Sequence, residues 1–329
     1  MKIIITGGAG FIGSHLTEYL SSVKKIKKII VIDNLEDGSK KNLNKALKSK
    51  KVLLYKIDIR NYEKIVNHFK NTIAVIHLAA LSDIVPSIEE PRDYLETNFN
   101  GTLNILEAMR KHNVKRIIYA ASSSCYGIVK KTPTSEKDQI DPMYPYAFSK
   151  YVGEELIKHY NKVYKLDYIS LRLFNVYGTR SRTNSAYGAA LGVFLKQKLE
   201  NKPFTVIGDG KQKRDFIHVS DVCDAFGKAI FSKHKNDIFN IGNGAPKSVN
   251  ELLRLIGGKK LFIPKRPGEP SITHANIKKV KSKLKWKPKV SFKDGINNVL
   301  NNIDYWKNSI LWDKNKIKKA TKNWFKYLK

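Results

Sequence analysis

A glycine-rich segment near the N-terminus constrains the fold of this chain more than any other part of the sequence. Three isoleucines within residues 2–5 are followed by Thr-Gly-Gly-Ala-Gly-Phe-Ile-Gly at 6–13, and then by a helical pattern through Leu20. In a strand, turn and helix of this kind, glycines let the backbone turn tightly and approach a pyrophosphate, whose charge is stabilised at the helix N-terminus. The series predicts a dinucleotide site at the start of an α/β fold.

An acidic residue after the next strand indicates which dinucleotide binds. Twenty residues beyond Gly13, the apolar run at 29–32 ends at Asp33 and Asn34. A carboxylate at this place accepts hydrogen bonds from both adenine-ribose hydroxyls and repels a 2′-phosphate. We therefore expect NAD to be the cofactor in preference to NADP.

Strand and helix patterns continue to alternate along the chain. Apolar strand runs lie at 52–57, 73–78, 114–121, 168–173 and 239–241, and helical patterns lie at 62–69, 91–112 and 146–164. This alternation predicts an α/β fold with a Rossmann-type doubly wound parallel sheet, whose site lies in the crevice at the carboxyl ends of the strands. A smaller, mixed α/β C-terminal lobe would bind the substrate.

The expected domain boundaries follow from the change in composition after the strand at 168–173. Residues 1–174 would form the NAD-binding domain, with 215–242 returning to it, and 175–214 and 243–309 would form the substrate-binding lobe. We expect residues 310–329 to form a basic amphipathic C-terminal helix. Four apolar residues recur there at helical spacing: Ile317, Ala320, Trp324 and Leu328. We expect this helix to dock on its own domain or on a neighbouring subunit rather than on a membrane surface.

The composition indicates an ordinary globular protein with an unusual charge. The formal net charge is +32, and 42% of the residues are hydrophobic. Because the lysines are spread in doublets along the chain, we interpret the charge as a compositional bias on solvated faces, and we expect no nucleic-acid partner. The two cysteines, Cys125 and Cys223, have no metal-ligand spacing, and the first apolar run is too short for a signal peptide or a membrane span. These features predict a cytoplasmic protein without a metal or integral membrane contact.

A tyrosine and a lysine four residues apart are the candidate catalytic pair. In Tyr-Ala-Phe-Ser-Lys at 146–150, helical spacing would place Tyr146 and Lys150 on one face, one turn apart. A free phenol titrates near pH ~10, so a base at neutral pH needs its pKa lowered by about 3 units, or about 4 kcal/mol. One cation at about 4 Å supplies roughly that much at an effective dielectric of about 20. We therefore expect Lys150 to lower the pKa of Tyr146, although such a pair also arises by chance on a lysine-rich helix.

Several motifs together resemble one family, the extended short-chain dehydrogenases/reductases, over roughly residues 1–305. The nearest resemblance is to NAD-dependent nucleotide-sugar epimerases and dehydratases, above all to UDP-hexose and UDP-N-acetylhexosamine 4-epimerases. The motifs that carry it are residues 6–13, Asp33-Asn34, Asp58-Ile59, Ala79-Ala80, Ser122 four before Tyr126, Tyr146 with Lys150, and the segments 172–178, 208–219 and 266–269.

The resemblance implies a role for each residue of the candidate site. Tyr146 would take the proton of the sugar 4-hydroxyl while hydride leaves carbon 4 for NAD. Lys150 would hold the nicotinamide ribose, and Ser122 would hydrogen-bond the reacting oxygen. The predicted catalytic residues are Ser122, Tyr146 and Lys150. The predicted cofactor-binding residues are Gly7, Gly10, Phe11, Ile12, Gly13, Asp33, Asn34, Asp58, Ile59, Leu78, Ala79, Ala80, Asn98, Tyr146, Lys150 and Phe174.

The implied substrate is a nucleotide-diphosphate sugar, a UDP-sugar above all, bound by an enzyme that we expect to be a homodimer. The predicted substrate-binding residues are Ser122, Asn175, Arg214, Arg266 and Thr273. In the family, the residue two before an Ala-Asn pair gates the space at carbon 2 of the sugar. Here that pair is Ala275-Asn276, so the small Thr273 predicts that UDP-N-acetylhexosamines are accepted alongside or in preference to UDP-glucose and UDP-galactose.

Three other functions remain open from the sequence. A 4,6-dehydratase of this family carries an Asp-Glu pair directly after the active-site hydroxyl residue, where this chain has Ser123 and Ser124. A 4-dehydrogenase that releases its keto product would use the same residues as an epimerase. The alternative from another class is a basic binding protein on the same scaffold, without catalysis.

Overall fold

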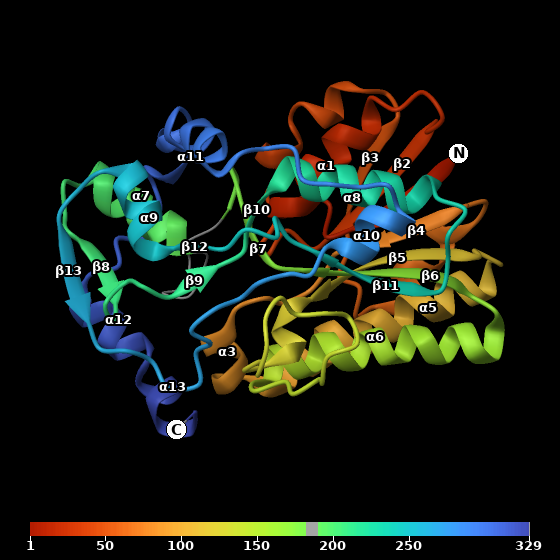
Figure 1. The fold of residues 1–329 in the computed structure, drawn as a ribbon. Coiled ribbons are helices and arrows are strands. Elements are labelled where there is room, and N and C mark those ends of the chain that lie inside the picture. The colour runs from red at the N-terminus through yellow and green to blue at the C-terminus, as the bar shows by residue number, and fades with distance from the viewer. Residues whose placement is uncertain (182–189, 329) are drawn as a thin grey trace.

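A parallel sheet forms the larger part of the molecule. The computed structural model describes residues 1–181 and 190–328, and within these residues seven parallel strands lie in the order β3-β2-β1-β4-β5-β6-β11. The order reverses direction between β1 and β4, which is where ligands bind in open α/β sheets. The predicted doubly wound fold is thus confirmed (Figure 1). The strands are β1 (Lys2–Thr6), β2 (Lys28–Asp33), β3 (Val52–Lys56), β4 (Ala74–His77), β5 (Arg116–Ser122), β6 (Asp167–Leu173) and β11 (Asp237–Ile241).

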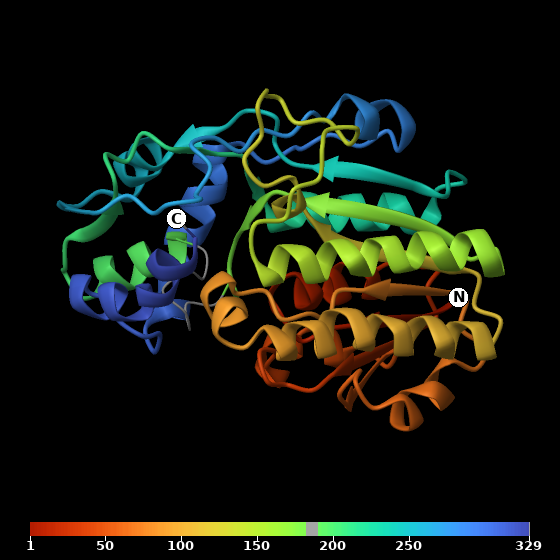
Figure 2. The ribbon, with the colours of Figure 1, turned by 90° about the horizontal axis from the view of Figure 1, so that it is seen from below.

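Helices cover both faces of this sheet, which explains why its central strands are continuously apolar. Ile3 and Ile5 point to one face and pack with Leu16 in one buried cluster, whereas Ile4 packs on the other face with Ile105 in a second cluster. Figures 1 and 2 show the two helix layers on either side of the sheet. The first layer contains α1 (Phe11–Ser21), α8 (Val219–Phe231) and α10 (Lys278–Lys283). The second contains α2 (Tyr62–Ile65), α4 (Pro91–Leu95), α5 (Gly101–Lys111) and α6 (Pro145–Tyr164).

The smaller part of the structure has a hydrophobic core of its own, which includes Phe194, Phe204, Leu252 and Trp306. Its short strands pair as β8 with β13, parallel, and β9 with β12, antiparallel, while β7 and β10 pair next to the large sheet. The domain boundaries given above stay a prediction. The elements are β7 (Asn175–Tyr177), α7 (Ala190–Leu199), β8 (Phe204–Ile207), β9 (Lys213–Arg214), β10 (Phe216–His218), β12 (Lys247–Ser248), α9 (Val249–Ile256), β13 (Lys260–Ile263) and α11 (Phe292–Leu300).

Two of the predicted helices are not regular in the structure. The helix expected at 91–112 is divided into α4 and α5 by a π-helical turn at Glu96–Asn100. The single C-terminal helix expected at 310–329 is wrong: the chain forms α12 (Lys314–Ala320) and α13 (Lys322–Tyr327). The first begins at Lys314 because the Asp313 side chain caps it, and it ends at Thr321, whose ψ of 6° departs from helical geometry.

Candidate functional site

The glycine turn closes one wall of a cavity of about 400 Å³ at the carboxyl ends of the central strands. Gly7 has φ +67°, and a Cβ built on it would lie 2.6 Å from the Ala79 nitrogen. A Cβ on Gly13 would lie 2.0 Å from the Gly7 oxygen. Only glycine fits at these two places, because Gly7 packs against the backbone that follows β4 and Gly13 packs against the backbone of the turn itself. The result is a cradle of bare backbone at the start of α1, which fits a dinucleotide pyrophosphate.

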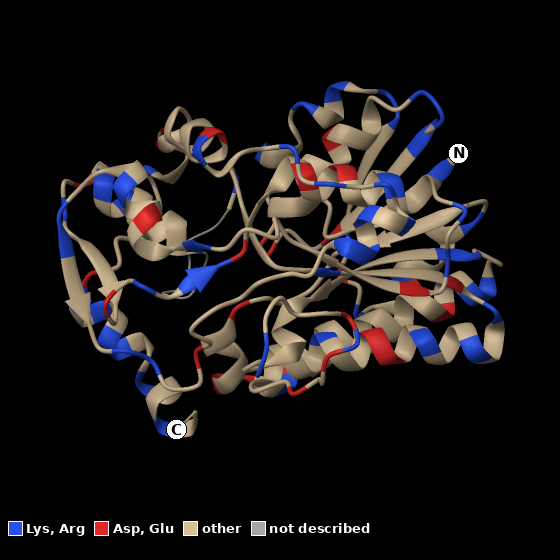
Figure 3. Ribbon diagram, in the orientation of Figure 1, with Lys and Arg blue, Asp and Glu red and all other residues tan. Residues whose placement is uncertain are grey.

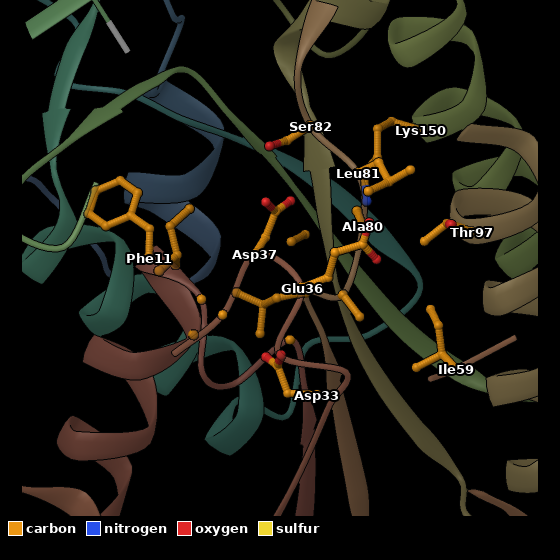
Figure 4. Close-up of a pocket in the computed structure, with 18 of the residues that line it drawn as sticks. Phe11, Asp33, Glu36, Asp37, Ile59, Ala80, Leu81, Ser82, Thr97 and Lys150 are labelled. Atoms are coloured by element: carbon orange, nitrogen blue, oxygen red, sulfur yellow. The ribbon is translucent and has the colours of Figure 1, made fainter. Parts of the chain in front are cut away.

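Nearly all of the predicted cofactor residues line this first cavity. Figure 4 shows Phe11 on one side of it, Lys150 and Thr97 on the other, and Asp33 at one end. The lining residues that the sequence predicted are Gly7, Gly10, Phe11, Ile12, Gly13, Asp33, Asn34, Asp58, Ile59, Leu78, Ala79, Ala80, Tyr146, Lys150 and Phe174.

Asp33 is held in a fixed orientation at the end of β2. Its Oδ2 accepts a hydrogen bond from the Ala9 nitrogen at 2.8 Å, and its Oδ1 accepts one from the Leu35 nitrogen at 2.9 Å. A carboxylate is an acceptor only and can accept several hydrogen bonds, which suits the hydroxyl groups of a ribose. The carboxylate therefore lies where the sequence analysis required it, in the wall of the first cavity.

Asn98 lies elsewhere than its predicted role requires. It is buried and is absent from the described residues that line the cavity. Its Oδ1 accepts a hydrogen bond from the Leu81 nitrogen at 2.8 Å, while its Nδ2 donates to the Leu81 oxygen and to Ser149 Oγ. Asn98 thus supports the cavity wall and α6 from behind, which its position in the sequence did not indicate.

Ser122 and Tyr146 face each other across the end of β5 and the first turn of α6. Burial raises the pKa of Tyr146, and a hydrogen bond with Ser122 opposes this rise. Ser122 Oγ also lies 2.8 Å from Ser124 Oγ. Ser124, which the sequence analysis did not count among the catalytic residues, therefore belongs to the same hydrogen-bonded group.

The pKa of Tyr146 is raised and not lowered in this structure, because burial of the phenol is the largest influence on it. The ammonium group of Lys150 lies 4.3 Å from the centre of the Tyr119 ring. Burial also lowers the pKa of Lys150 to about 7, against the opposing charge of Glu154. A lysine with this pKa is only partly protonated at neutral pH, which the four-residue spacing could not reveal.

A second cavity of about 360 Å³ adjoins the first, and Ser122 and Tyr146 line both. Ser122 and Tyr146 therefore lie at the junction of the two cavities, of which the first suits a dinucleotide and the second can hold another ligand. The second cavity is lined by the remaining predicted substrate residues, Asn175, Arg214, Arg266 and Thr273.

The buried carboxylate of Asp215 brings these substrate-side segments together. It accepts hydrogen bonds from the backbone nitrogens of Asn243 at 2.6 Å and Ala275 at 2.8 Å. The Asp215 nitrogen donates to Thr273 Oγ1, which itself donates to Asn175 Oδ1 at 2.7 Å. Among the described residues that line the second cavity, Thr273 is present and its two chain neighbours are not.

The two predicted phosphate-binding arginines have different surroundings. Arg214 Nη2 donates to Glu269 Oε1 at 2.6 Å, so a carboxylate already faces this guanidinium. Arg266 is buried and follows β13 by three residues. Planar guanidinium groups of this kind offer paired donors to phosphate oxygens.

Lys and Arg residues are spread over the elements of both parts (Figure 3). Among residues 1–181 and 190–328, no group of His, Cys, Asp and Glu is arranged to hold a metal ion. Within the same described residues, no helix combines the length and the apolar character that a membrane crossing needs.

Comparison with known proteins assigns this arrangement to a family. The NAD dependent epimerase/dehydratase family matches residues 3–242. The chain belongs to this family. It is 40% identical to a putative UDP-glucose 4-epimerase of Methanocaldococcus jannaschii, over 91% of this chain and 97% of that protein. The family assignment establishes an NAD-dependent enzyme, and the cradle at Gly7 and Gly13 fits that cofactor.

Two solved structures of UDP-sugar epimerases have the same fold. The UDP-glucose 4-epimerase of Thermotoga maritima, with UDP-glucose, has a TM-score of 0.85 and 33% identity, covering 93% of this chain and 99% of that chain. The UDP-N-acetylglucosamine 4-epimerase of Methanobrevibacter ruminantium, in complex with UDP-N-acetylmuramic acid, has a TM-score of 0.84 and 30% identity, covering 92% and 98%.

We predict that Asp33 makes this epimerase/dehydratase family member select NAD. A like charge at close range costs several kcal/mol at intermediate dielectric, so NADP should bind at least about tenfold more weakly than NAD. Calorimetric titration of the cofactor-free protein measures both affinities. Asp33→Asn should narrow the difference between the NAD and NADP affinities. The control is Asp58→Asn, which removes another carboxylate from the same cavity and should leave this difference unchanged. Equal affinities for the two cofactors in the wild-type protein would contradict the prediction.

Proposed function

We propose that this enzyme is a nucleotide-sugar 4-epimerase, which inverts carbon 4 of a UDP-hexose or UDP-N-acetylhexosamine through a transient 4-keto sugar. The observation that carries the proposal is the position of Ser122 and Tyr146, where the first and second cavities meet. A sugar in the second cavity would have its reacting hydroxyl beside these two groups and beside the cofactor space. The family relatives named above support a UDP-sugar as the substrate class.

The residues of this chain account for the proton transfer and for substrate binding. Tyr146, as a phenolate, would take the proton of the 4-hydroxyl, and Ser122 would donate a hydrogen bond to the developing keto oxygen. NAD, when bound, supplies the hydride acceptor and a positive charge that favours the phenolate. Arg214 and Arg266 would hold the diphosphate, and Asn175 would contact the sugar or the diphosphate.

Inversion requires the sugar to turn while the nucleotide stays bound. The phosphate ligands Arg214 and Arg266 lie on the substrate side of the cavity junction, so they can retain the diphosphate while the 4-keto sugar presents its other face. Carbon 4 would then regain the hydride on that other face, and Tyr146 would return the proton to the oxygen. No net oxidation occurs, so one cofactor molecule serves many turnovers.

The two serines after Ser122 favour epimerisation over dehydration. Loss of water across carbons 5 and 6 needs an acid and a base next to the sugar. Ser123 and Ser124 occupy the corresponding positions and line the second cavity, but neither carries a carboxylate. A releasing 4-dehydrogenase would differ only in its product. A panel of UDP-, GDP- and dTDP-sugars with NMR identification of the products tests the proposal, and an accumulating keto sugar would overturn it.

We predict that Tyr146→Phe lowers turnover by about 100- to 10,000-fold, the usual contribution of a positioned acid or base. The change removes one oxygen and retains the ring, which packs 6.4 Å from Tyr144 and from Tyr94, so the melting temperature and NAD affinity should stay near wild type. The matched control is Tyr151→Phe, the same deletion on the same helix outside both cavities. Turnover of the Tyr146 variant within threefold of wild type would remove Tyr146 from the mechanism.

We predict that Thr273→Tyr selectively abolishes activity on UDP-N-acetylglucosamine, because the larger ring would fill the space for the acetyl group. The variant also loses the hydrogen bond of Thr273 to Asn175. Thr273→Ala loses the same bond without adding volume, and it is the control for that loss. Steady-state kinetics should show that the tyrosine variant loses activity on UDP-N-acetylglucosamine but keeps activity on UDP-glucose. The alanine variant should not show this difference between the two sugars. A parallel fall for both sugars would show that Thr273 is not the gate.

We also propose that the enzyme is a cytoplasmic homodimer. Leu95 of α4 and Phe148 of α6 are 38% and 47% exposed, and these two helices contact each other. An exposed apolar surface on adjacent helices is typical of a subunit interface. Light scattering should give twice the mass of the chain, and Phe148→Lys should give the monomer mass. A wild-type monomer at micromolar concentration would contradict the dimer.

Cys125 and Cys223 are free and buried, which suits a reducing compartment such as the cytoplasm.

A further inference from the structure

The C-terminal helices α12 and α13 contribute to the second cavity. They lie outside residues 3–242, which match the family, and they pass between the smaller part and α3 (Ile84–Glu89) in Figure 1. Ile317 of α12 and Trp324 of α13 are 5% and 2% exposed, and both line the second cavity. These two residues of the apolar stripe therefore border the candidate substrate space and are shielded from solvent.

Trp324 contacts two segments of the chain that contribute residues to that cavity. Its Nε1 donates a hydrogen bond to the Pro267 oxygen at 2.7 Å, in the loop that carries Arg266. Its ring lies 6.1 Å from the ring of Tyr144, which stacks on Tyr146 at 6.4 Å with an interplanar angle of 10°.

Neighbouring contacts hold the segment in this place. Asn323 Nδ2 donates to Glu89 Oε1 at 2.9 Å, which joins α13 to α3 of the larger part. Ile317 packs against Ile263 at the end of β13 in the smaller part. The segment is thus anchored on both parts of the structure, and its position does not depend on Trp324 alone.

The two attachments of Trp324 correspond to the two ends of the bound sugar. If the proposed function is right, carbon 4 lies at Tyr146 and the diphosphate lies at Arg214 and Arg266. Trp324 contacts a neighbour of each of these groups and lines the second cavity, which would place it beside the space for the hexose. An indole offers a large, rigid apolar surface, which suits the C–H face of a sugar ring.

We propose that Trp324 is a specificity-determining residue of the hexose subsite. Its ring packs against the sugar, and its N–H group fixes the loop at Pro267 that presents Arg266. The first role affects only ligands that carry a sugar. The second affects every ligand that carries the diphosphate. This difference separates a sugar contact from a purely structural anchor.

The test compares UDP with UDP-sugars in full-length variants. Calorimetric titration measures the affinities of UDP, UDP-glucose, UDP-N-acetylglucosamine and NAD. Trp324→Ala should weaken the UDP-sugars about tenfold more than UDP, since loss of an aromatic contact of this size corresponds to roughly that factor. Trp324→Phe loses the N–H donor but keeps a ring, so it should weaken UDP and UDP-sugars by the same factor. NAD affinity should not change in either variant.

The control is Tyr327→Ala, which removes an aromatic residue that is 59% exposed on the same helix and should leave all affinities at wild-type values. If Trp324→Ala fails to fold, Trp324→Leu replaces it, because it retains apolar volume but no aromatic surface. An unchanged ratio of UDP to UDP-sugar affinity in the folded variant overturns the proposal and leaves Trp324 as an anchor. Failure of the wild-type enzyme to bind any UDP-sugar would instead contradict the proposed function.

Discussion

A buried ion pair between β6 and α6 holds the catalytic part of this structure together. Arg172 and Glu154 have side chains that are each 2% exposed, and Arg172 Nη2 lies 2.6 Å from Glu154 Oε1. Arg172 Nη1 also donates to the Tyr126 hydroxyl at 2.9 Å, and that hydroxyl donates to Asn240 of β11. The catalytic helix, the loop after Ser122 and the edge strand therefore meet at one guanidinium. Loss of one partner from such a pair costs about 3–5 kcal/mol, because the other charge stays buried.

The same pair influences the chemistry of the site. Burial lowers the pKa of Lys150 to about 7, and the negative charge of Glu154, one turn further along α6, raises it. Without that carboxylate, Lys150 would be still less protonated at neutral pH. A residue that the fold needs for stability therefore also helps to keep a cation beside the cofactor cavity, although it touches neither cavity.

Neutral hydrogen bonds support the cofactor cavity from behind. The buried His77 lies at the end of β4, with Nδ1 at 2.6 Å from Thr6 Oγ1 and Nε2 at 2.9 Å from Thr102 Oγ1. Burial lowers its pKa to about 3, so this histidine is neutral and acts as a connector rather than as a base. Together with Asn98, which joins the 79–82 wall to α6, it gives the cofactor site rigid support without placing a charge in the core.

The sequence by itself determined the fold class, the cofactor and about half of the residues that line the cofactor cavity. The glycine turn, Asp33 and the residues at strand ends belong to short segments, and the carboxyl ends of parallel strands always meet at one edge of a sheet. Local geometry was therefore enough to bring them together. Gly7 and Gly13 illustrate the reason, because close backbone contact at the turn admits no other residue.

Only the tertiary structure decided the orientation of Lys150 toward Tyr119, the supporting position of Asn98 and the role of the C-terminal segment. A spacing of four residues places two side chains on one face of a helix, but burial and neighbouring rings decide their pKa values and directions. Likewise, the apolar stripe at Ile317 and Trp324 predicted only that this segment would dock. Its position over the second cavity depends on contacts with residues far away in the chain, such as Pro267, Tyr144 and Glu89, which no local pattern encodes.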